Sequence, residues 1–475
     1  MVFSSVIFLF LFLPLVLLGH FLLPARFKNL FLLIASLVFY AWGETTYTLV
    51  ILASIVVNYV TGVLIDRSSD PRRRKWAVTV GIVLNLGMLI AFKYAYFLVE
   101  NINIVLAALH LNTLPNTHAH LPLGISFFTF QAISYIVDVY RSDVKAQGNF
   151  INYALYKALF PQLIAGPIVR YIDVSKQITS RTVSRADFAT GIRIFLVGLG
   201  KKVLIANIVS AQVDRIFAIP PGDLPMSIAW IGIIGFFFQL YFDFSGYSDM
   251  AIGMGRMLGF HLLQNFNYPY ISKTLTEFWQ RWHISLSTWF RDYLFTPLGG
   301  YKRNRTRAYF NLMTVFLLCG IWHGASWNFV IFGAYQGFFL ILERIFRAKH
   351  MKFFKSPLGN VYLLLVILST MVFFRTDSLV HAGGFFKALS GFVLPNSGVY
   401  LPGAYLNREV IVAAIAATIG SAPFIPWLNR KLRNRGPALD LIRQTGALAG
   451  LAVMLLLCAM KLAAGTHNPF IYFRF

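Results

Sequence analysis

Long apolar runs separated by short polar stretches dominate this chain and predict a bundle of membrane helices. A spanning helix needs about 20 mostly apolar residues, and residues 5–24 meet that requirement. The same pattern predicts spans at residues 30–43, 47–65, 76–95, 121–140, 188–207, 226–245, 309–323, 326–346, 358–375, 408–428 and 444–463. Less regular apolar stretches at 97–111, 148–170 and 383–395 predict interfacial or re-entrant segments. We therefore expect an all-α polytopic membrane protein with roughly 11–15 membrane helices, including such segments, in one membrane domain over residues 1–475.

The positions of lysine and arginine predict the orientation of these helices. Cytoplasmic loops carry an excess of basic residues, which assigns residues 25–29, 66–75, 141–145 and 170–185 to the cytoplasmic side. Residues 44–46, 112–120 and 218–225 contain no lysine or arginine and are assigned to the opposite side, as is the N-terminus. Residues 148–170 then enter and leave on one side, and Pro161, Gly166 and Pro167 favour a broken, re-entrant segment there.

Composition supports a membrane protein and argues against other classes. Of the 475 residues, 57% are hydrophobic and 13% are charged, whereas soluble domains carry about 25% charged residues. The net charge of +24 could suggest nucleic-acid binding, but the basic residues lie in short stretches between apolar runs. No nucleic-acid partner is expected. The two cysteines, Cys319 and Cys458, lie within apolar runs and predict neither a disulfide nor a zinc site.

His323 is the most unusual single residue, because apolar runs flank it on both sides. It lies in the sequence Gly-Ile-Trp-His-Gly-Ala-Ser-Trp, which spans residues 320–327. Ionisable groups at membrane depth are costly, and by default they indicate a functional site. Histidine can accept and return a proton near neutral pH. The sequence therefore predicts that His323 faces the protein interior or a water-filled cavity and carries chemistry.

A polar cluster follows the apolar run that begins near residue 226. It contains Tyr241, Asp243, Ser245, Tyr247 and Asp249. If the cluster is helical, Asp243 and Tyr247 lie on one face. A simpler interpretation is a helix that ends at the headgroup region, where Ser and Asp cap the next helix. Both interpretations remain open at this point.

Residues 276–294 alternate tryptophans with charged residues and predict an amphipathic interfacial helix. Glu277 and Arg281 have the spacing of a pair on one helix face. His283 lies in this segment and is either an ordinary interfacial histidine or a functional one. The loop histidines His118 and His120 have no carboxylate near them in the sequence and are expected to be solvated.

Several catalytic signatures of soluble enzymes are missing from the chain. It contains no GxSxG turn, no Walker A loop, no HExxH and no GxGxxG followed by an acidic residue. Two interpretations from other functional classes therefore stay open beside an enzyme. One is a proton-coupled transporter in which His323, Asp243 and His283 relay protons. The other is a non-catalytic subunit of an export complex.

These motifs resemble the membrane-bound O-acyltransferase family over the whole chain. The resemblance is closest to its bacterial branch, which includes the membrane proteins of alginate O-acetylation and teichoic-acid D-alanylation. The shared motifs are Tyr-Phe-Asp-Phe-Ser-Gly-Tyr-Ser-Asp-Met-Ala at 241–251, Phe-Trp-x-Arg-Trp-His-Ile-Ser-Leu-Ser at 278–287, Trp-His-Gly at 322–324, Pro-x-Leu-Ile-Ala-Gly-Pro at 161–167 and the aromatic end at 470–475.

The resemblance implies a helical core in which two funnels meet at a thin point, with His323 as catalytic histidine and His283 as the second one. It implies supporting or tunnel-lining roles for Tyr241, Asp243, Ser245, Tyr247, Asp249, Trp282 and Trp322, and no metal. An oxyanion donor would be His283, Tyr241 or Tyr247, while Asp243 would orient a histidine.

The resemblance also implies an activity and partners. The expected donor is acetyl-CoA on the cytoplasmic side, with no permanently bound cofactor. The acetyl group would pass through the bacterial inner membrane to an extracytoplasmic acetyltransferase or acyl-carrier protein of a polysaccharide export system. Alginate is the expected polymer, and cellulose or another cell-envelope polymer is the alternative. Membrane lipid is the other expected partner.

Overall fold

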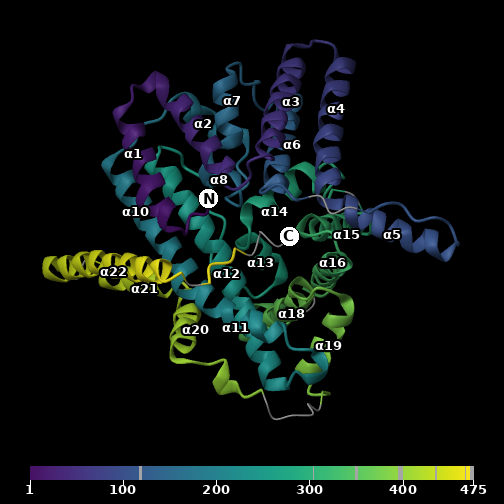
Figure 1. The fold of residues 1–475 in the computed structure, drawn as a ribbon, viewed down its shortest axis with the longest axis vertical. Helices are drawn as coiled ribbons and strands as arrows, with labels where there is room; N and C mark the ends of the chain where they lie inside the picture. The colour runs from purple at the N-terminus through teal and green to yellow at the C-terminus, as the bar shows by residue number, and fades with distance from the viewer. Residues whose placement is uncertain are drawn as a thin grey trace. The chain divides into compact units, whose positions relative to one another are not determined.

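The computed structural model describes residues 1–116, 120–302, 304–347, 351–393, 400–433, 436–465 and 467–470, and every regular element in them is helical (Figure 1). Seven of these helices are long and apolar enough to cross a membrane, or eight if one bent pair counts as a single span. The all-α polytopic fold is confirmed. The expected count of roughly 11–15 is higher, because helices such as α2 (Ala25–Ala41) and α6 (Ile125–Arg141), each of 17 residues, are too short to qualify.

The chain divides into two compact units, which are described one at a time. Unit 1 comprises Met1–Gly191 and Ala251–Leu263, and unit 2 comprises Ile192–Met250 and Gln264–Phe475. Two of the three boundaries fall within α10 (Arg185–Gly200) and α12 (Met226–Met257), and the third follows Leu263 in the segment after α12. That the whole chain forms a single membrane domain stays a prediction.

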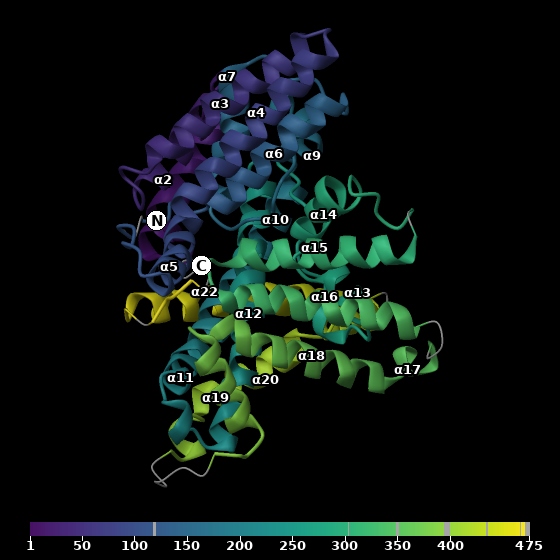
Figure 2. The same ribbon diagram turned by 90° about the vertical axis from the view of Figure 1, so that its right-hand side faces the viewer.

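Unit 1 is built around helices α3, α4 and α6, which run side by side (Figures 1 and 2). Its elements are η1 (Phe8–Phe12), α1 (Leu13–Leu22), α2, α3 (Thr48–Arg67), α4 (Pro71–Leu89), η2 (Ile90–Tyr94), α5 (Ala95–Ala108), α6, α7 (Phe150–Ala158), α8 (Phe160–Leu163) and α9 (Tyr171–Thr179). Buried Asn58 and Asn85 join α3 to α4 by reciprocal hydrogen bonds of 3.1 and 2.7 Å. Such paired amides satisfy polar groups that lipid cannot solvate.

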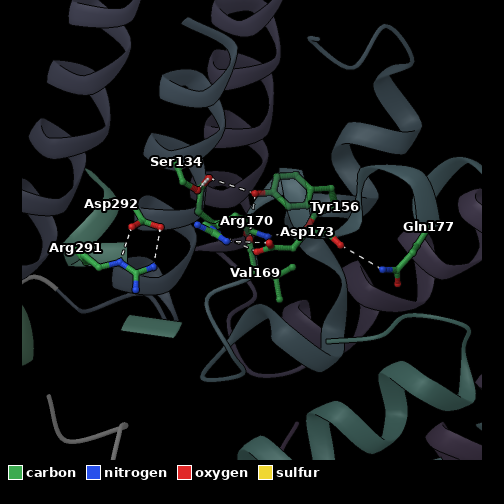
Figure 3. Close-up of polar contacts among 9 residues, drawn as sticks. Ser134, Tyr156, Val169, Arg170, Asp173, Gln177, Arg291 and Asp292 are labelled. Atoms are coloured by element: carbon green, nitrogen blue, oxygen red, sulfur yellow. Dashed lines mark hydrogen bonds and ion pairs between the residues drawn. The ribbon is translucent and has the colours of Figure 1, made fainter. Parts of the chain in front are cut away.

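The segment expected to be re-entrant, residues 148–170, forms a broken helix inside unit 1. α7 and α8 are separated at Leu159, and most of their side chains are buried. Figure 3 shows how the segment ends: the Tyr156 hydroxyl donates to the Val169 carbonyl at 3.2 Å, and Arg170 pairs with Asp173 at 3.0 Å. Gln177 then donates to the Asp173 carbonyl at 3.2 Å. The break is confirmed, whereas entry and exit on one membrane side stay a prediction.

Unit 2 contains a layer of three long helices, α15 (Arg305–His323), α16 (Trp327–Arg347) and α18 (Pro357–Arg375), which run side by side in Figure 2. Its other elements are the rest of α10, η3 (Lys201–Ala206), α11 (Asn207–Phe217), η4 (Pro221–Asp223), α12, η5 (Pro269–Ile271), α13 (Leu275–Arg281), α14 (Ile284–Phe290), η6 (Arg291–Phe295), α17 (Met351–Lys355), α19 (Leu379–Leu389), η7 (Pro402–Ala404), α20 (Arg408–Gly420), α21 (Phe424–Leu432) and α22 (Pro437–Ala463).

Two sequence-based expectations about these elements are wrong, and a third gains a detail. The apolar run at 408–428 forms two helices, α20 and α21, which are bent by 64° at a break that contains Pro423 and together are long and apolar enough for one span. The run at 226–245 does not end at the polar cluster, since α12 continues to Met257. The apolar stretches 76–95 and 97–111 are not separate, because Pro71–Ala108 forms one continuous helical stretch of 38 residues.

One loop histidine has a partner that the sequence did not indicate. The predicted solvation of His120 is confirmed, because its side chain is 57% exposed, but its Nε2 also lies 3.1 Å from both carboxylate oxygens of Glu44. Glu44 is buried and also accepts the backbone N–H of Leu123 at 3.3 Å. The sequence separation of 76 residues hid this pair. His118 lies outside the described residues.

Candidate active site

His323 is the last residue of α15, and close helix packing fixes its position. The chain leaves the helix at Gly324, whose backbone is extended. A Cβ atom at Gly320 would lie 2.2 Å from the Phe329 carbonyl oxygen, and one at Gly333 would lie 2.3 Å from that of Phe316. Only glycine permits this approach of α15 to α16. The glycine contacts therefore place the C-terminal turn of α15, and with it His323, against α16.

Three aromatic rings enclose the imidazole of His323, whose residue is 4% exposed. The ring centroids of Trp322, Phe332 and Phe374 lie 4.9, 5.5 and 5.2 Å away, each in an edge-to-face arrangement. Phe332 comes from α16 and Phe374 from α18. The imidazole thus lies where α15, α16 and α18 meet within unit 2.

His323 also lines a small cavity of about 30 Å³ in unit 2. The other lining residues are Leu240, Phe278, Trp279, Trp282, Phe332, Gln336, Ile367, Thr370, Met371 and Phe374. Gln336 accepts the indole N–H of Trp279 at 3.0 Å and donates to the Thr370 hydroxyl at 2.9 Å. Two polar lining side chains are therefore bonded within the wall itself. His323 is the titratable group among these lining residues, and the space holds about one water-sized group.

His283 lies at a break between two short helices rather than in the single interfacial helix expected over 276–294. α13 ends at Arg281, and α14 begins after His283, whose backbone is left-handed with φ 44° and ψ 55°. Asn265 stabilises this turn: its carbonyl accepts the Ile284 N–H at 3.0 Å, and its Oδ1 accepts the Ser285 N–H at 3.1 Å. The single-helix prediction is wrong because these bonds favour the left-handed turn over a continuous helix.

The same asparagine determines which nitrogen of His283 carries the proton. Nδ1 of His283 lies 3.3 Å from Oδ1 of Asn265. The Ser285 N–H must face an acceptor, so the amide oxygen points to this side and Nδ1 of the imidazole is the donor. Nε2 is then the acceptor of the neutral ring. Burial lowers the pKa of His283, and the His323 ring lowers it further, which favours the neutral form.

Trp322 lies between the two histidines. Its ring centroid is 6.0 Å from that of His283 and 4.9 Å from that of His323. His283 is fully buried, and Phe244 packs against it edge-on at 4.7 Å. We call His283, Trp322, His323 and the adjoining cavity the histidine site.

Buried polar contacts from α16 hold α13 beside this site. The Glu343 carboxylate accepts the backbone N–H groups of Leu275 and Thr276 at 2.6 and 3.2 Å, together with the Thr276 hydroxyl at 2.6 Å. A carboxylate is favourable at a helix N-terminus, where N–H groups lack partners inside the helix. The predicted Glu277–Arg281 pair is confirmed at 2.9 Å on the more exposed face of α13.

The polar cluster of α12 divides between two environments. Tyr241 belongs to an aromatic group with its ring centroid 5.0 Å from Tyr270 and 6.1 Å from Trp282, a residue that lines the cavity. Ser245 is fully buried. Since α12 continues through the cluster, the interpretation of Ser and Asp as caps at a helix end is wrong.

The two aspartates of the cluster form ion pairs with consecutive lysines of η3. Lys202 Nζ lies 2.7 Å from Asp243 Oδ1, with both side chains at most 3% exposed, and Lys201 Nζ lies 2.6 Å from Asp249 Oδ2. Gly246 permits the approach, because a Cβ atom there would lie 2.7 Å from the Gly198 carbonyl oxygen. We call Lys201, Lys202, Asp243 and Asp249 the ion-pair layer.

The C-terminal segment adds to this layer. Lys202 also donates to the Pro469 carbonyl, and the Phe470 ring stacks on Tyr247 at 4.5 Å. Residues 471–475 of the predicted aromatic end lie outside the described residues. The ion pair of Asp243 is with Lys202, and orientation of a histidine by Asp243 stays a prediction.

Sequence reasoning thus identified both histidines and missed several of their neighbours. Trp282 and His323 line the cavity, Trp322 connects it to His283, and Tyr241 contacts Trp282. Asn265 was missed and has no local signal, because an isolated asparagine in a loop predicts nothing. Lys202 did have a signal: it is a charge within the apolar run 188–207.

The known proteins that this chain is similar to are O-acyltransferases and O-acetylases. The model of the family described as "MBOAT, membrane-bound O-acyltransferase family" matches residues 37–380. "Probable alginate O-acetylase AlgI" of Azotobacter vinelandii is 39% identical over 502 aligned positions that cover the whole of both chains. The protein of the same name from Pseudomonas aeruginosa is 38% identical, again over the whole of both. "Peptidoglycan O-acetyltransferase" of Helicobacter pylori is 36% identical over 86% of this chain and 82% of that protein.

Proposed function

Because the chain belongs to the membrane-bound O-acyltransferase family and is an O-acyltransferase of the membrane, we propose that it transfers acetyl groups for the O-acetylation of an exported polysaccharide such as alginate. Acetyl-CoA on the cytoplasmic side is the donor. The observation that carries the proposal is His323, a buried imidazole beside a small cavity, with His283 across Trp322. Both histidines belong to the site that the family resemblance implies.

The size of the cavity supports a small acyl group. Its volume of about 30 Å³ and its aromatic wall leave little room beside the His323 imidazole. An acetyl carbon can enter such a space, whereas a long acyl chain meets Phe332, Met371 and Phe374. The apolar wall excludes bulk water, which strengthens electrostatic contacts and limits hydrolysis of the thioester.

His323 has two routes to the product. As a general base it takes the proton of the acceptor hydroxyl while that oxygen bonds to the acetyl carbon. The carbon–sulfur bond then breaks, and the thiolate of CoA takes up the proton. As a nucleophile, His323 first bonds to the acetyl carbon and releases CoA, and the acceptor hydroxyl then displaces the imidazole. Both routes give one ester and one free thiol.

His283 is better suited to accept a hydrogen bond or a proton than to stabilise an oxyanion. Its Nδ1–H donates to Asn265, and its burial favours a neutral ring with an unprotonated Nε2. Donation to an oxyanion would need a second proton on this ring. Among the predicted oxyanion donors, Tyr241 is the best placed to donate a hydrogen bond, because its ring contacts the cavity residue Trp282.

The proposed path links the two sides of the bacterial inner membrane. The distribution of lysine and arginine supports a multi-pass protein with its N-terminus outside. The acceptor is then an extracytoplasmic acetyltransferase or acyl-carrier protein of the export system, which passes the group to the polymer. The relatives named as alginate O-acetylases support alginate, and the Helicobacter pylori relative supports peptidoglycan as the second candidate polymer.

Labelled acetyl-CoA tests the proposal. Purified protein is incubated with the label, with and without a hydroxyl acceptor, and wild type is compared with His323→Ala. We expect transfer to fall by about 10²–10⁴-fold in the variant. Label on wild-type protein without acceptor indicates the nucleophilic route, and its absence indicates the general-base route. His261→Ala, at an exposed histidine, is the matched control. Equal transfer by wild type and His323→Ala would exclude the catalytic role of His323.

The polymer is identified separately. The gene is deleted in its native host, and ester-linked acetate is measured on exported polysaccharide and on peptidoglycan. Loss from one polymer alone identifies the acceptor pathway, and restoration by wild type but not by His323→Ala ties that loss to the histidine site. If His323→Ala restores acetylation fully, the chain acts as a non-catalytic subunit.

A further inference from the structure

Unit 2 contains a second and larger cavity, of about 200 Å³, in which none of the histidine-site residues takes part. Its walls come from α11, α12, α20 and the residues just before α20: Val209, Gln212, Val213, Ile216, Trp230, Ile231, Ile234, Gly235, Phe238, Tyr405, Leu406, Val410 and Ala414. Twelve of these thirteen lining side chains carry no amide or charge, and Gln212 is the exception. The cavity opens to the surface, because Ile234 and Leu406 at its edge are 42% and 38% exposed.

An apolar cavity of this size favours an apolar occupant. Water enters a cavity only where several polar partners are available to it, and here the lining offers little beyond Gln212. Left empty, the lining loses van der Waals contacts on one side. Both α12 and the continuous stretch that contains α11 are long and apolar enough to cross a membrane. The apolar molecules next to such helices are the acyl chains of membrane lipids.

The shape of the lining fits a chain rather than a compact ligand. On α12 it extends from Trp230 to Phe238, which is about 12 Å along the axis at 1.5 Å per residue. On α11 it extends from Val209 to Ile216. Gly235 widens the space between the two helices, because it presents no side chain toward Val213, whose Cγ2 would lie 2.8 Å from an added Cβ.

One end of the cavity carries positive charge. The Arg215 guanidinium lies 5.1 Å above the ring of the lining residue Tyr405, and it donates to the Gln212 amide oxygen at 2.9 Å. Both contacts are to uncharged groups, and Arg215 is exposed. The neighbouring Asp214 carboxylate is held by Arg375 at 2.7 Å and His467 at 3.2 Å. The charge of Arg215 is therefore available to a phosphate at this end.

We propose that this cavity is a binding site for an anionic phospholipid, with one acyl chain between α11, α12 and α20 and the phosphate on Arg215. The predicted topology places the loop after α11 outside, so the lipid belongs to the outer leaflet of the inner membrane. Arg408, two positions after the lining residue Leu406, adds a second cation at the start of α20. Its neighbour Glu409 is paired with Lys461 at 2.9 Å and does not cancel it.

Trp230 lines the cavity and reports on its contents. Its indole N–H donates to the Leu389 carbonyl at 3.1 Å, which fixes the ring. Bromine atoms on an acyl chain quench tryptophan fluorescence on contact. Purified full-length protein is titrated in micelles with brominated phosphatidylglycerol or brominated phosphatidylcholine. The same titration of Trp230→Phe is subtracted, because eight other tryptophans also fluoresce.

We expect Trp230-dependent quenching to saturate, and to do so at a lower concentration of phosphatidylglycerol than of phosphatidylcholine. Arg215→Gln should weaken phosphatidylglycerol binding roughly tenfold, since it removes a charge-assisted contact to phosphate. Ala414→Phe should abolish saturable quenching by filling the cavity. Ala416→Phe, at an exposed position on the same helix, is the matched control and should bind like wild type.

Three outcomes would overturn the proposal. Equal quenching of wild type and Ala414→Phe would show that the chain does not enter the cavity. Quenching that rises linearly and alike for both lipids would indicate bulk detergent and lipid only. Saturable quenching by a brominated fatty acid that matches phosphatidylglycerol and ignores Arg215→Gln would identify a free fatty acid as occupant. Each readout is independent of acyl transfer.

Discussion

The histidine site and the ion-pair layer both lie in unit 2, yet the first is lined mainly by aromatic side chains and the second consists of charged ones. Around His323 the contacts are aromatic rings, and the polar side chains of the adjoining cavity wall form neutral hydrogen bonds with one another. In the ion-pair layer, Lys202 and Asp243 are almost fully buried at 2.7 Å from each other. The same helix, α12, contributes to both, with Leu240 in the cavity wall and Asp243 in the layer.

The difference indicates that one region serves activity and the other serves stability. An imidazole in an aromatic wall can take up a proton and return it near neutral pH, which suits chemistry. A buried ion pair is costly to break, because removing one partner leaves an uncompensated charge. We therefore expect substitutions in the ion-pair layer to reduce stability first, and substitutions in the histidine site to reduce activity first.

Asp243→Ala should have the largest effect on stability. It leaves the Lys202 ammonium buried without its carboxylate, which destabilises by about 3–5 kcal/mol in comparable pairs. Unfolding of the purified protein in detergent, followed by temperature and by denaturant, measures the change. His323→Ala is expected to unfold much closer to wild type.

The double variant Asp243→Leu, Lys202→Met sharpens the test by removing both charges together. It should recover most of the stability that Asp243→Ala loses, because no buried charge is left without a partner. If the double variant is stable and fully inactive, Asp243 takes part in the chemistry and the division between the two regions fails.

Gly320→Ala should have the next largest effect, and it acts on the packing that positions His323. The new methyl group would lie 2.2 Å from the Phe329 carbonyl oxygen and would push α15 away from α16. Overpacking of this kind destabilises by about 1–3 kcal/mol, and the shift of His323 should also slow transfer. Activity and unfolding are measured on the same preparation.

Gly446→Ala in α22 is the matched control, because a methyl group there meets nothing within 4 Å. It should unfold at or slightly above the wild-type temperature, since alanine favours helix more than glycine does. A Gly320→Ala variant as active and stable as wild type would mean that the contact between α15 and α16 does not determine the position of His323.

Much of the fold follows from the sequence because hydrophobic length alone predicts a spanning helix. The runs at 47–65, 326–346 and 358–375 correspond closely to α3, α16 and α18. The failures have a common cause. The left-handed turn at His283 is bonded by Asn265, and the aspartates Asp243 and Asp249 within α12 are paired with Lys202 and Lys201. A hydropathy pattern does not predict such tertiary contacts.

The candidate site shows the same limit. His323 was predictable, because an ionisable residue between two apolar runs is rare and needs a reason. The aromatic rings around His323 were not predictable from the sequence. Phe332 and Phe374 look like any other apolar helix residues until α16 and α18 are placed against α15. Likewise, His120 and Glu44 looked unrelated until the fold brought the two loops together.

Asn265→Ala should separate activity from stability more cleanly than any substitution in the ion-pair layer. It removes the acceptor of the His283 Nδ1–H, the Ser285 N–H and the Ser285 hydroxyl, the last at 3.0 Å. Lost buried hydrogen bonds destabilise by about 1–3 kcal/mol. The turnover rate should fall with little change in KM, because the His283 ring loses its fixed tautomer while the cavity wall stays intact.

Asn265→Asp is the informative companion, since it keeps an acceptor for all three donors. It should retain more activity than Asn265→Ala and shift the pH profile upward, because a carboxylate favours the protonated imidazole. Identical pH profiles for wild type and Asn265→Asp would show that His283 does not titrate during the reaction.

Glu277→Gln should have the smallest effect on stability and activity, because it removes a partly exposed ion pair rather than a buried one. Glu277 and Arg281 are paired at 2.9 Å, but their side chains are 35% and 28% exposed. Partly exposed pairs of this spacing contribute about 0.3–0.5 kcal/mol, so unfolding and transfer should both stay near wild-type values. Glu343→Gln is the contrast on the buried side of the same helix, because its carboxylate accepts two backbone N–H groups of α13. A larger loss in Glu277→Gln than in Glu343→Gln would place the support of α13 on its exposed face and contradict the role of burial.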